Sequence, residues 1–142
     1  MLDIHVGQTA SRSLTVTPEM IESYAQITGD RNPLHFDAAF TAKTRFGRLM
    51  AQGGIATGLL HALVAMDMPG AGTVFTKQTW VFPRPVFIGD TITAEATVLT
   101  VHPRRPMADL AFMVTNQDGD EVLKGEATIF QAIPDSSPPE EK

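Results

Sequence analysis

The first part of the chain carries a hydrophobic repeat that is typical of a helix. Apolar and small side chains recur at helical spacing over residues 21–28, after a short run at 13–16 that we expect to form a strand. Thr17 and Pro18 are suited to the N-cap and the first helical position, and Gly29 is a common helix terminator. The pattern therefore predicts a helix between these signals.

A second apolar stretch, Gly53–Met68, differs in kind because it has almost no polar face. A helix with such a sequence is expected to be buried nearly all round. Pro69 and Gly70 supply its end. The stretch is too short and too rich in glycine for a membrane span.

The second half of the chain shows the alternation of apolar and other residues that indicates half-buried strands. Asp118-Gly119 between the last two is a strong hairpin signal, and Trp80 and Phe82 are expected in the core. The expected strands are Thr73–Phe82, Thr91–Val101, Met107–Thr115 and Glu121–Ala132. One way to bury the central helix is to curl the sheet around it, which is an α+β arrangement.

Length, charge and composition narrow the class of protein. The 142 residues suit one domain, which we place at 1–133, followed by a proline-rich, charged tail at 134–142 that we expect to be disordered. The net charge of −5 argues against a nucleic-acid partner. With no cysteine, disulfides and thiolate chemistry are excluded. The N-terminus lacks the pattern of a signal peptide, so we expect a cytoplasmic protein with no membrane partner.

The densest group of chemically active side chains lies at 29–37. Asp30 and His35 are five residues apart, and Gly29 and Pro33 make a continuous helix between them unfavourable. A loop could bring both side chains into one pocket for proton transfer, with Asn32 orienting one of them. The alternative from spacing alone is that Asp30 caps a helix and His35 is a packed surface residue.

The segment Tyr24–Asp37 also resembles a known signature. It contains Gly-Asp-Arg-Asn-Pro-Leu-His-Phe-Asp at 29–37, which is similar to the motif of the MaoC-like (R)-specific enoyl-CoA hydratases, also called hydratase 2. The resemblance extends over about residues 5–132 and includes a Phe-x-x-Pro-Val-x-x-Gly-Asp element at 82–90. It implies a single hot-dog domain, in which an antiparallel sheet wraps around the central helix. It also implies that Asp30 and His35 are the catalytic pair and that Asn32 supports them.

The same resemblance implies a site for the thioester oxygen of the substrate. Negative charge grows on that oxygen during the reaction, so it needs hydrogen-bond donors placed in advance. Gly53 and Gly54, at the start of the central helix, are the candidates, with a backbone N–H of Gly53 as the donor. The alternative is that both glycines only permit close packing. The family often has His-Gly here, whereas this chain has Gln52-Gly53.

The remaining candidates have less support. Arg48, Arg84 and Arg104, with the adjacent Arg105, could bind the phosphates of coenzyme A, although solvated surface is the simpler interpretation. His61 is expected to be a packed or interface residue. No set of histidines and carboxylates has metal-ligand spacing, so no metal site is predicted.

We therefore predict a reversible 2-enoyl-thioester hydratase and 3-hydroxyacyl dehydratase of (R) specificity, without a metal or redox cofactor. Its partner is an acyl-CoA or acyl-carrier-protein thioester, and it is expected to form a homodimer or a dimer-based oligomer because an open sheet leaves an edge to pair. Two alternatives remain: a hot-dog acyl-CoA thioesterase, and a non-catalytic subunit that binds acyl thioesters.

Overall fold

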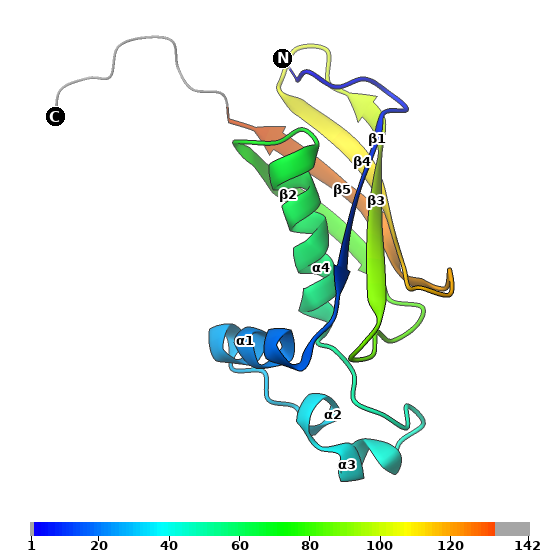
Figure 1. The fold of residues 1–142 in the computed structure, drawn as a ribbon. Coiled ribbons are helices and arrows are strands. Elements are labelled where there is room, and N and C mark those ends of the chain that lie inside the picture. Colours follow the sequence, from blue (N-terminus) through cyan, green and yellow to red (C-terminus); the bar gives the residue numbers. More distant parts are fainter. Residues whose placement is uncertain (1, 133–142) are drawn as a thin grey trace, which may run out of the picture.

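Five antiparallel strands and a helix lying across them account for most of residues 2–132, the part of the chain that the computed structural model describes (Figure 1). The strands are β1 (Thr9–Thr15), β2 (Thr73–Val81), β3 (Thr91–Val101), β4 (Met107–Thr115) and β5 (Glu121–Gln131). Their order in the sheet is β1-β3-β4-β5-β2, and all neighbours pair antiparallel. β1 and β2 are therefore the two edges.

The first helices leave the end of β1 and lie beyond one end of the sheet (Figure 1). In α1 (Pro18–Thr28) the Thr17 hydroxyl accepts a hydrogen bond from the backbone N–H of Met20, and Gly29 takes a left-handed conformation with φ of 82°. These are the cap and the terminator that the sequence predicts. Two short helices follow, α2 (Pro33–Phe36) and α3 (Ala38–Ala42).

The central apolar stretch forms α4 (Gly53–Ala62), which continues directly into a π-helical turn, η1 (Leu63–Asp67). The expectation that it would be buried all round is wrong for the single chain. Gly58, His61 and Met66 are exposed, whereas Leu60 and Leu63 are fully buried. Much of the exposed face of α4 is glycine, which adds no side chain, so the sequence gives little sign that this side is open.

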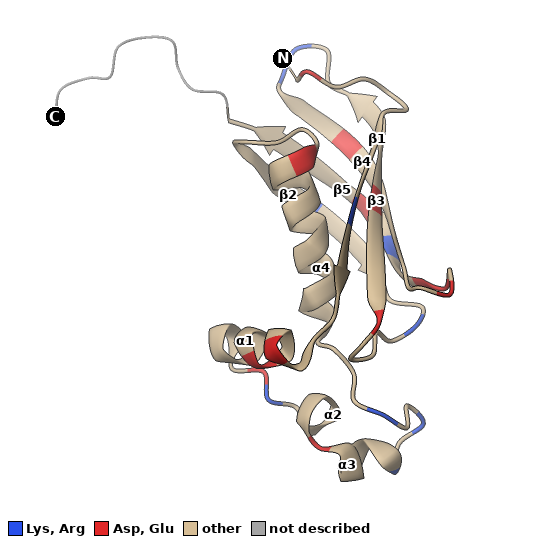
Figure 2. Ribbon diagram, viewed as in Figure 1, with Lys and Arg blue, Asp and Glu red and all other residues tan. Residues whose placement is uncertain are grey.

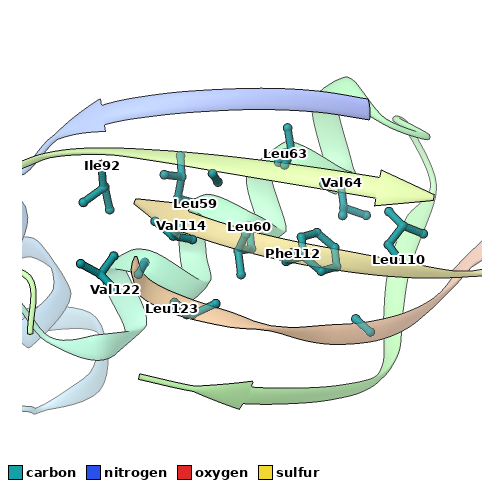
Figure 3. Packing of buried hydrophobic residues seen from close by; sticks show 14 of the residues in the cluster. Leu59, Leu60, Leu63, Val64, Ile92, Leu110, Phe112, Val114, Val122 and Leu123 are labelled. Carbon is teal, nitrogen blue, oxygen red and sulfur yellow. The ribbon is translucent and has the colours of Figure 1, made fainter. Parts of the chain in front are cut away.

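The core lies between α4 and the concave face of the sheet (Figure 3). Leucine and valine side chains of α4 and η1 contact inward-facing residues of the three central strands, such as Ile92, Leu110 and Val114. Along β4, buried and partly buried residues alternate without a break. This is the sheet wrapped around a helix that the resemblance implies, and the hot-dog fold is confirmed.

Strand limits agree closely with the prediction except at the edges. β3 and β4 have the predicted ends, and β2 and β5 end one residue early. β1 begins at Thr9 rather than at residue 13, because its outer residues are polar and only its pairing with β3 reveals it. The tail predicted at 134–142 lies outside the described residues, as does residue 133. None of the helices in residues 2–132 is long and apolar enough to cross a membrane.

Candidate active site

Asp30 and His35 are brought together by the turn that joins α1 to α2. One carboxylate oxygen of Asp30, Oδ1, accepts a hydrogen bond from the backbone N–H of Asn32 at 3.2 Å. The other, Oδ2, lies 3.7 Å from Nε2 of His35. That distance exceeds a hydrogen bond, so each atom keeps capacity for a third molecule. The turn therefore places a carboxylate and an imidazole around one point, as the sequence predicts.

The ring of His35 is held in one orientation from its other side. Nδ1 lies 2.8 Å from the backbone carbonyl of Met50. Because a carbonyl can only accept, Nδ1 carries the proton, and Nε2 of the neutral ring is left as an acceptor facing Asp30. His35 is 8% exposed, so it is a buried residue rather than the packed surface residue of the alternative interpretation.

Asn32 has a different role from the one expected. Its Oδ1 accepts the backbone N–H of Leu34 at 3.0 Å, which makes it the N-cap of α2. Its side chain forms no hydrogen bond with Asp30 or His35, so any support that it gives to the pair acts through its backbone and through the cap. By capping α2, Asn32 fixes the short helix that carries His35.

The turn is tied to α1 by Arg31, a residue that the sequence analysis did not single out. Its guanidinium forms two hydrogen bonds with the carboxylate of Glu22, at 2.9 and 3.0 Å. This pairing lowers the pKa of Glu22 and raises the pKa of Arg31. The guanidinium also lies 5.6 Å from the centre of the Phe36 ring. Both ends of the turn are thus fastened on its exposed side.

The chain then returns as an extended segment, residues 49–52, to the start of α4. The backbone N–H of Met50 donates to Leu34, and that of Ala51 donates to Val86. Met50 also forms an isolated bridge with Phe87. These bonds connect the His35 helix, the start of α4 and the Phe82–Asp90 element in one hydrogen-bonded unit.

Asp90 fixes that last element from inside the protein. Its carboxylate is 4% exposed and accepts hydrogen bonds from the backbone N–H of Phe87 at 2.9 Å and from the side-chain amide of Gln117 at 3.0 Å. A buried carboxylate is tolerated when such donors satisfy it. The Gly-Asp of the sequence element therefore has a structural role.

Gly53 and Gly54 differ sharply in their surroundings. A Cβ on Gly54 would collide with the hydroxyl group of Tyr24, whereas one on Gly53 would meet only the ring of Phe82, at an ordinary 3.5 Å. The close-packing interpretation thus holds for Gly54. No acceptor within residues 2–132 takes the backbone N–H of Gly53, which points out from the first turn of α4 as a helix N-terminus leaves it.

A cavity of about 290 Å³ opens beside this helix start. Its lining includes Met50, Gly53 and Phe82, together with Arg45 and Arg84. Met50 joins the cavity to the pair, since its carbonyl also holds His35. Phe82 is 53% exposed and lies over Gly53, so the expectation that it belongs to the core is wrong.

The arginines predicted to bind phosphate are not all near this cavity. Arg84 lines it and lies 3.7 Å from Asp120. Arg48 is on the connection from α3 to α4, but its guanidinium stacks 4.0 Å from the centre of the Phe87 ring. Arg104 lies in the β3–β4 connection and does not line the cavity. Arg45, which the sequence analysis missed, does line it. The basic residues of the α3–α4 and β2–β3 connections lie towards the same end of the molecule, whereas the β3–β4 connection is at the opposite end (Figure 2).

His61 contacts β2 and not the Asp30–His35 pair. Its Nε2 lies 3.1 Å from the side-chain oxygen of Gln78, and its ring stacks on Phe75 with centroids 4.1 Å apart. One face of its ring thus packs against β2, as expected, although the residue as a whole is exposed. Within residues 2–132, no cluster of three or more histidine, aspartate or glutamate side chains has the arrangement of a metal site.

Comparisons with known proteins agree on one family. The model of the MaoC-like domain family matches residues 4–117. The chain is 34% identical to an (R)-specific enoyl-CoA hydratase of Aeromonas caviae, covering 89% of this chain and 94% of that protein. It is 39% identical to a 3-hydroxybutyryl-CoA dehydratase of Methylorubrum extorquens, covering 89% and 80%. The solved structure of an R-hydratase from Pseudomonas aeruginosa superimposes with a TM-score of 0.85 at 34% identity, covering 99% of this chain and 94% of that one.

Proposed function

Because the chain belongs to the MaoC-like domain family, we propose that it is a hydro-lyase that adds water reversibly across the C2=C3 double bond of a 2-enoyl thioester with (R) specificity. The observation that supports this most directly is the arrangement of Asp30 and His35. Two proton acceptors, Oδ2 and Nε2, lie 3.7 Å apart, and one is held in a fixed tautomer by Met50. Such a pair suits the activation of one water molecule.

The proposed reaction balances without a redox partner. The pair removes a proton from water as the water oxygen bonds to C3, and a proton is returned to C2, so the net change is the addition of one water. Charge moves through the conjugated system onto the thioester oxygen. The free N–H of Gly53, at the positive end of α4, is the donor proposed for that oxygen. Gly54 instead lets α4 approach Tyr24.

The cavity beside Gly53 is the proposed entrance for the thioester carrier. Arg45 and Arg84 are the residues proposed to meet its phosphate, since a guanidinium fork matches phosphate oxygens. Coenzyme A and the phosphopantetheine arm of an acyl-carrier protein both carry phosphate, so these arginines suit either carrier. Related proteins with names of both kinds exist: the Aeromonas relative is a CoA-thioester hydratase, and a tomato relative is a mitochondrial acyl-carrier-protein dehydratase.

We also propose that the chain acts as a homodimer joined through β2. Among the strands of residues 2–132, this edge strand pairs with β5 alone, and Val74 and Val81 on it are 54% and 51% exposed. The other edge, β1, presents mostly polar side chains. Pairing of β2 with a second copy would remove an open edge and cover these valines. Sedimentation should give twice the mass of the chain, and a species of single-chain mass at micromolar concentration would contradict the proposal.

The activity is tested by loss of enoyl absorbance across a series of 2-enoyl-CoA and enoyl-carrier-protein esters, with chiral analysis of the product. Hydration to an (R)-3-hydroxyacyl thioester is expected. A predominantly (S) product would contradict the assignment of the site. Release of free thiol without hydration would indicate the thioesterase alternative, and saturable binding without turnover would indicate the binding subunit.

A further inference from the structure

Gln52 is a buried polar residue that the proposed chemistry does not use. It is 2% exposed and occupies the N-cap position of α4, yet its side chain makes no capping hydrogen bond. The amide nitrogen instead donates to the backbone carbonyl of Ile21, in α1, at 3.1 Å. Its amide oxygen has no hydrogen-bond partner within residues 2–132. The side chain therefore connects two helices and leaves one buried acceptor unsatisfied.

This connection joins the two halves of the proposed site. Ile21 belongs to the helix that ends at Gly29, directly before Asp30. On the other side, Gln52 directly precedes Gly53, whose N–H is the donor proposed for the thioester oxygen. The backbone contacts of Met50 join α2, the ring of His35 and Phe87, but do not reach α1. Gln52 thus provides a direct side-chain hydrogen bond from α1 to the start of α4.

We propose that Gln52 is a positioning residue: by tying α1 to the start of α4, its amide sets the separation between the Asp30–His35 pair and the N–H of Gly53. This inference rests on the hydration proposed above. Proton transfer at C2 and charge on the thioester oxygen occur on adjacent parts of one substrate, so the groups that serve them must keep a fixed spacing. A displacement of about 1 Å can reduce a rate about 100-fold.

A purely stabilising role does not account for this side chain. A buried amide with an unsatisfied oxygen costs free energy that an apolar side chain of similar size avoids. The carbonyl of Ile21 lies within α1, where it also accepts the backbone N–H of the helix four residues later. Removing the amide of Gln52 therefore leaves this carbonyl with a hydrogen-bond donor. Leucine at this position should therefore fold at least as well as glutamine, and its effect on turnover isolates the positioning role.

The test compares Gln52→Leu, which cannot donate, with Gln52→His, whose ring N–H can donate to Ile21. Gln26→Leu is the matched control, because it makes the same chemical change on an exposed part of α1. We expect Gln52→Leu to lower kcat about 10- to 100-fold with little change in KM and no fall in Tm. Gln52→His should recover most of kcat, and Gln26→Leu should match the wild type.

A kcat of Gln52→Leu equal to that of the wild type would overturn the inference. A loss of kcat that is accompanied by a fall in Tm, with neither quantity restored in Gln52→His, would also overturn it. Amide hydrogen exchange separates this outcome from failure of the proposed function. If the wild-type chain turns over no enoyl thioester, the hydration proposal fails. Faster exchange at the hydrogen-bonded amides of His35 and Ile55 in Gln52→Leu alone would still support the positioning role, and unchanged exchange would overturn it.

Discussion

Replacing Asp30 by asparagine should remove most of the activity while leaving the fold almost unchanged. Asparagine keeps an oxygen in the place of Oδ1, so the turn bond to the N–H of Asn32 is retained. What changes is the atom facing His35, where an NH₂ group replaces an acceptor. The side chain of Asp30 is 41% exposed and 3.7 Å from the imidazole, so the lost pairing is worth at most about 1 kcal/mol.

The expected effect on the reaction is much larger. One general acid–base group contributes about 10²- to 10⁴-fold, which corresponds to about 2.7–5.4 kcal/mol of barrier. The change in Tm should stay under about 4 °C for a chain of this size. Initial rates measured as loss of enoyl absorbance, alongside a thermal melt, report both quantities on one sample.

Asp37→Asn is the matched control. Asp37 caps α3 through a 3.0 Å bond from the backbone N–H of Phe40, and asparagine is an equally good cap. It therefore removes the same charge from the next connection along the chain without touching His35. Near-normal turnover by Asp30→Asn, or an equal loss in Asp37→Asn, would refute the assignment of Asp30.

His35 needs a different substitution. Alanine would leave the buried carbonyl of Met50 without its donor, at a cost of about 1–3 kcal/mol. Asparagine has an NH₂ group near the position of Nδ1 and lacks Nε2, so His35→Asn should fold and lose turnover. If both residues act on one water, the double variant with Asp30→Asn should be little slower than the worse single variant. Losses that multiply would show that the two act separately.

Two further predictions concern the glycine pair and the outer face of the sheet. Gly54→Ala should lower the free energy of unfolding by about 1–3 kcal/mol in chemical denaturation, because its Cβ meets Tyr24. Gly53→Ala should unfold no more easily than the wild type but should raise KM. The reverse pattern would contradict the roles given to the two glycines. Hydrogen bonds from the hydroxyl of Thr128 and from a second threonine lower the pKa of Asp109. The charged carboxylate therefore stabilises the fold above the pKa of the unfolded chain, about 3.9. This stabilisation is lost as the pH falls through the lower pKa of the folded protein. The gap in unfolding free energy between the wild type and Asp109→Asn should therefore close below about pH 4, and a gap that is constant with pH would contradict this.

The sequence predicts the central strands well because each has one face in the core, and this burial appears as an alternation of apolar residues along the strand. β4 alternates buried and partly buried side chains over its whole length, which is the period that identifies a strand. The first half of β1 escapes this reasoning and only its end, from residue 13, is predicted, since most of its residues are exposed and its hydrogen bonds depend on β3, some eighty residues away. An edge strand is defined by its partner more than by its own pattern.

The exposed face of α4 shows a second limit. Glycine and alanine raise the apolar content of a segment without supplying side chains to bury, so Gly53–Met68 appears fully apolar while Gly58 and His61 remain open. The hydrophobic periodicity of a sequence indicates which residues favour burial. It does not measure whether a neighbouring element covers them.

For the site, spacing and resemblance locate Asp30 and His35, but the chemistry of the imidazole depends on an atom that no motif contains. The carbonyl of Met50, fifteen residues from His35, decides which ring nitrogen carries the proton. Likewise, Arg45 enters the cavity lining only because the connection from α3 folds back towards Arg84. Backbone atoms and long-range approaches carry no sequence signature, so they become visible only in the fold.

The Phe82–Asp90 element illustrates how a motif can serve a site without a side chain in it. Its buried Asp90 accepts the N–H of Phe87, which shapes the turn whose backbone pairs with residues 49–51. That pairing fixes the carbonyl of Met50 and the segment that leads into Gly53. The orientation of the His35 ring and the direction of the Gly53 N–H therefore depend on one hydrogen-bonded unit. The two glycine-containing motifs of the sequence, at residues 29–37 and 82–90, are thus parts of a single scaffold, because the backbone of the second helps to hold the segment that orients His35.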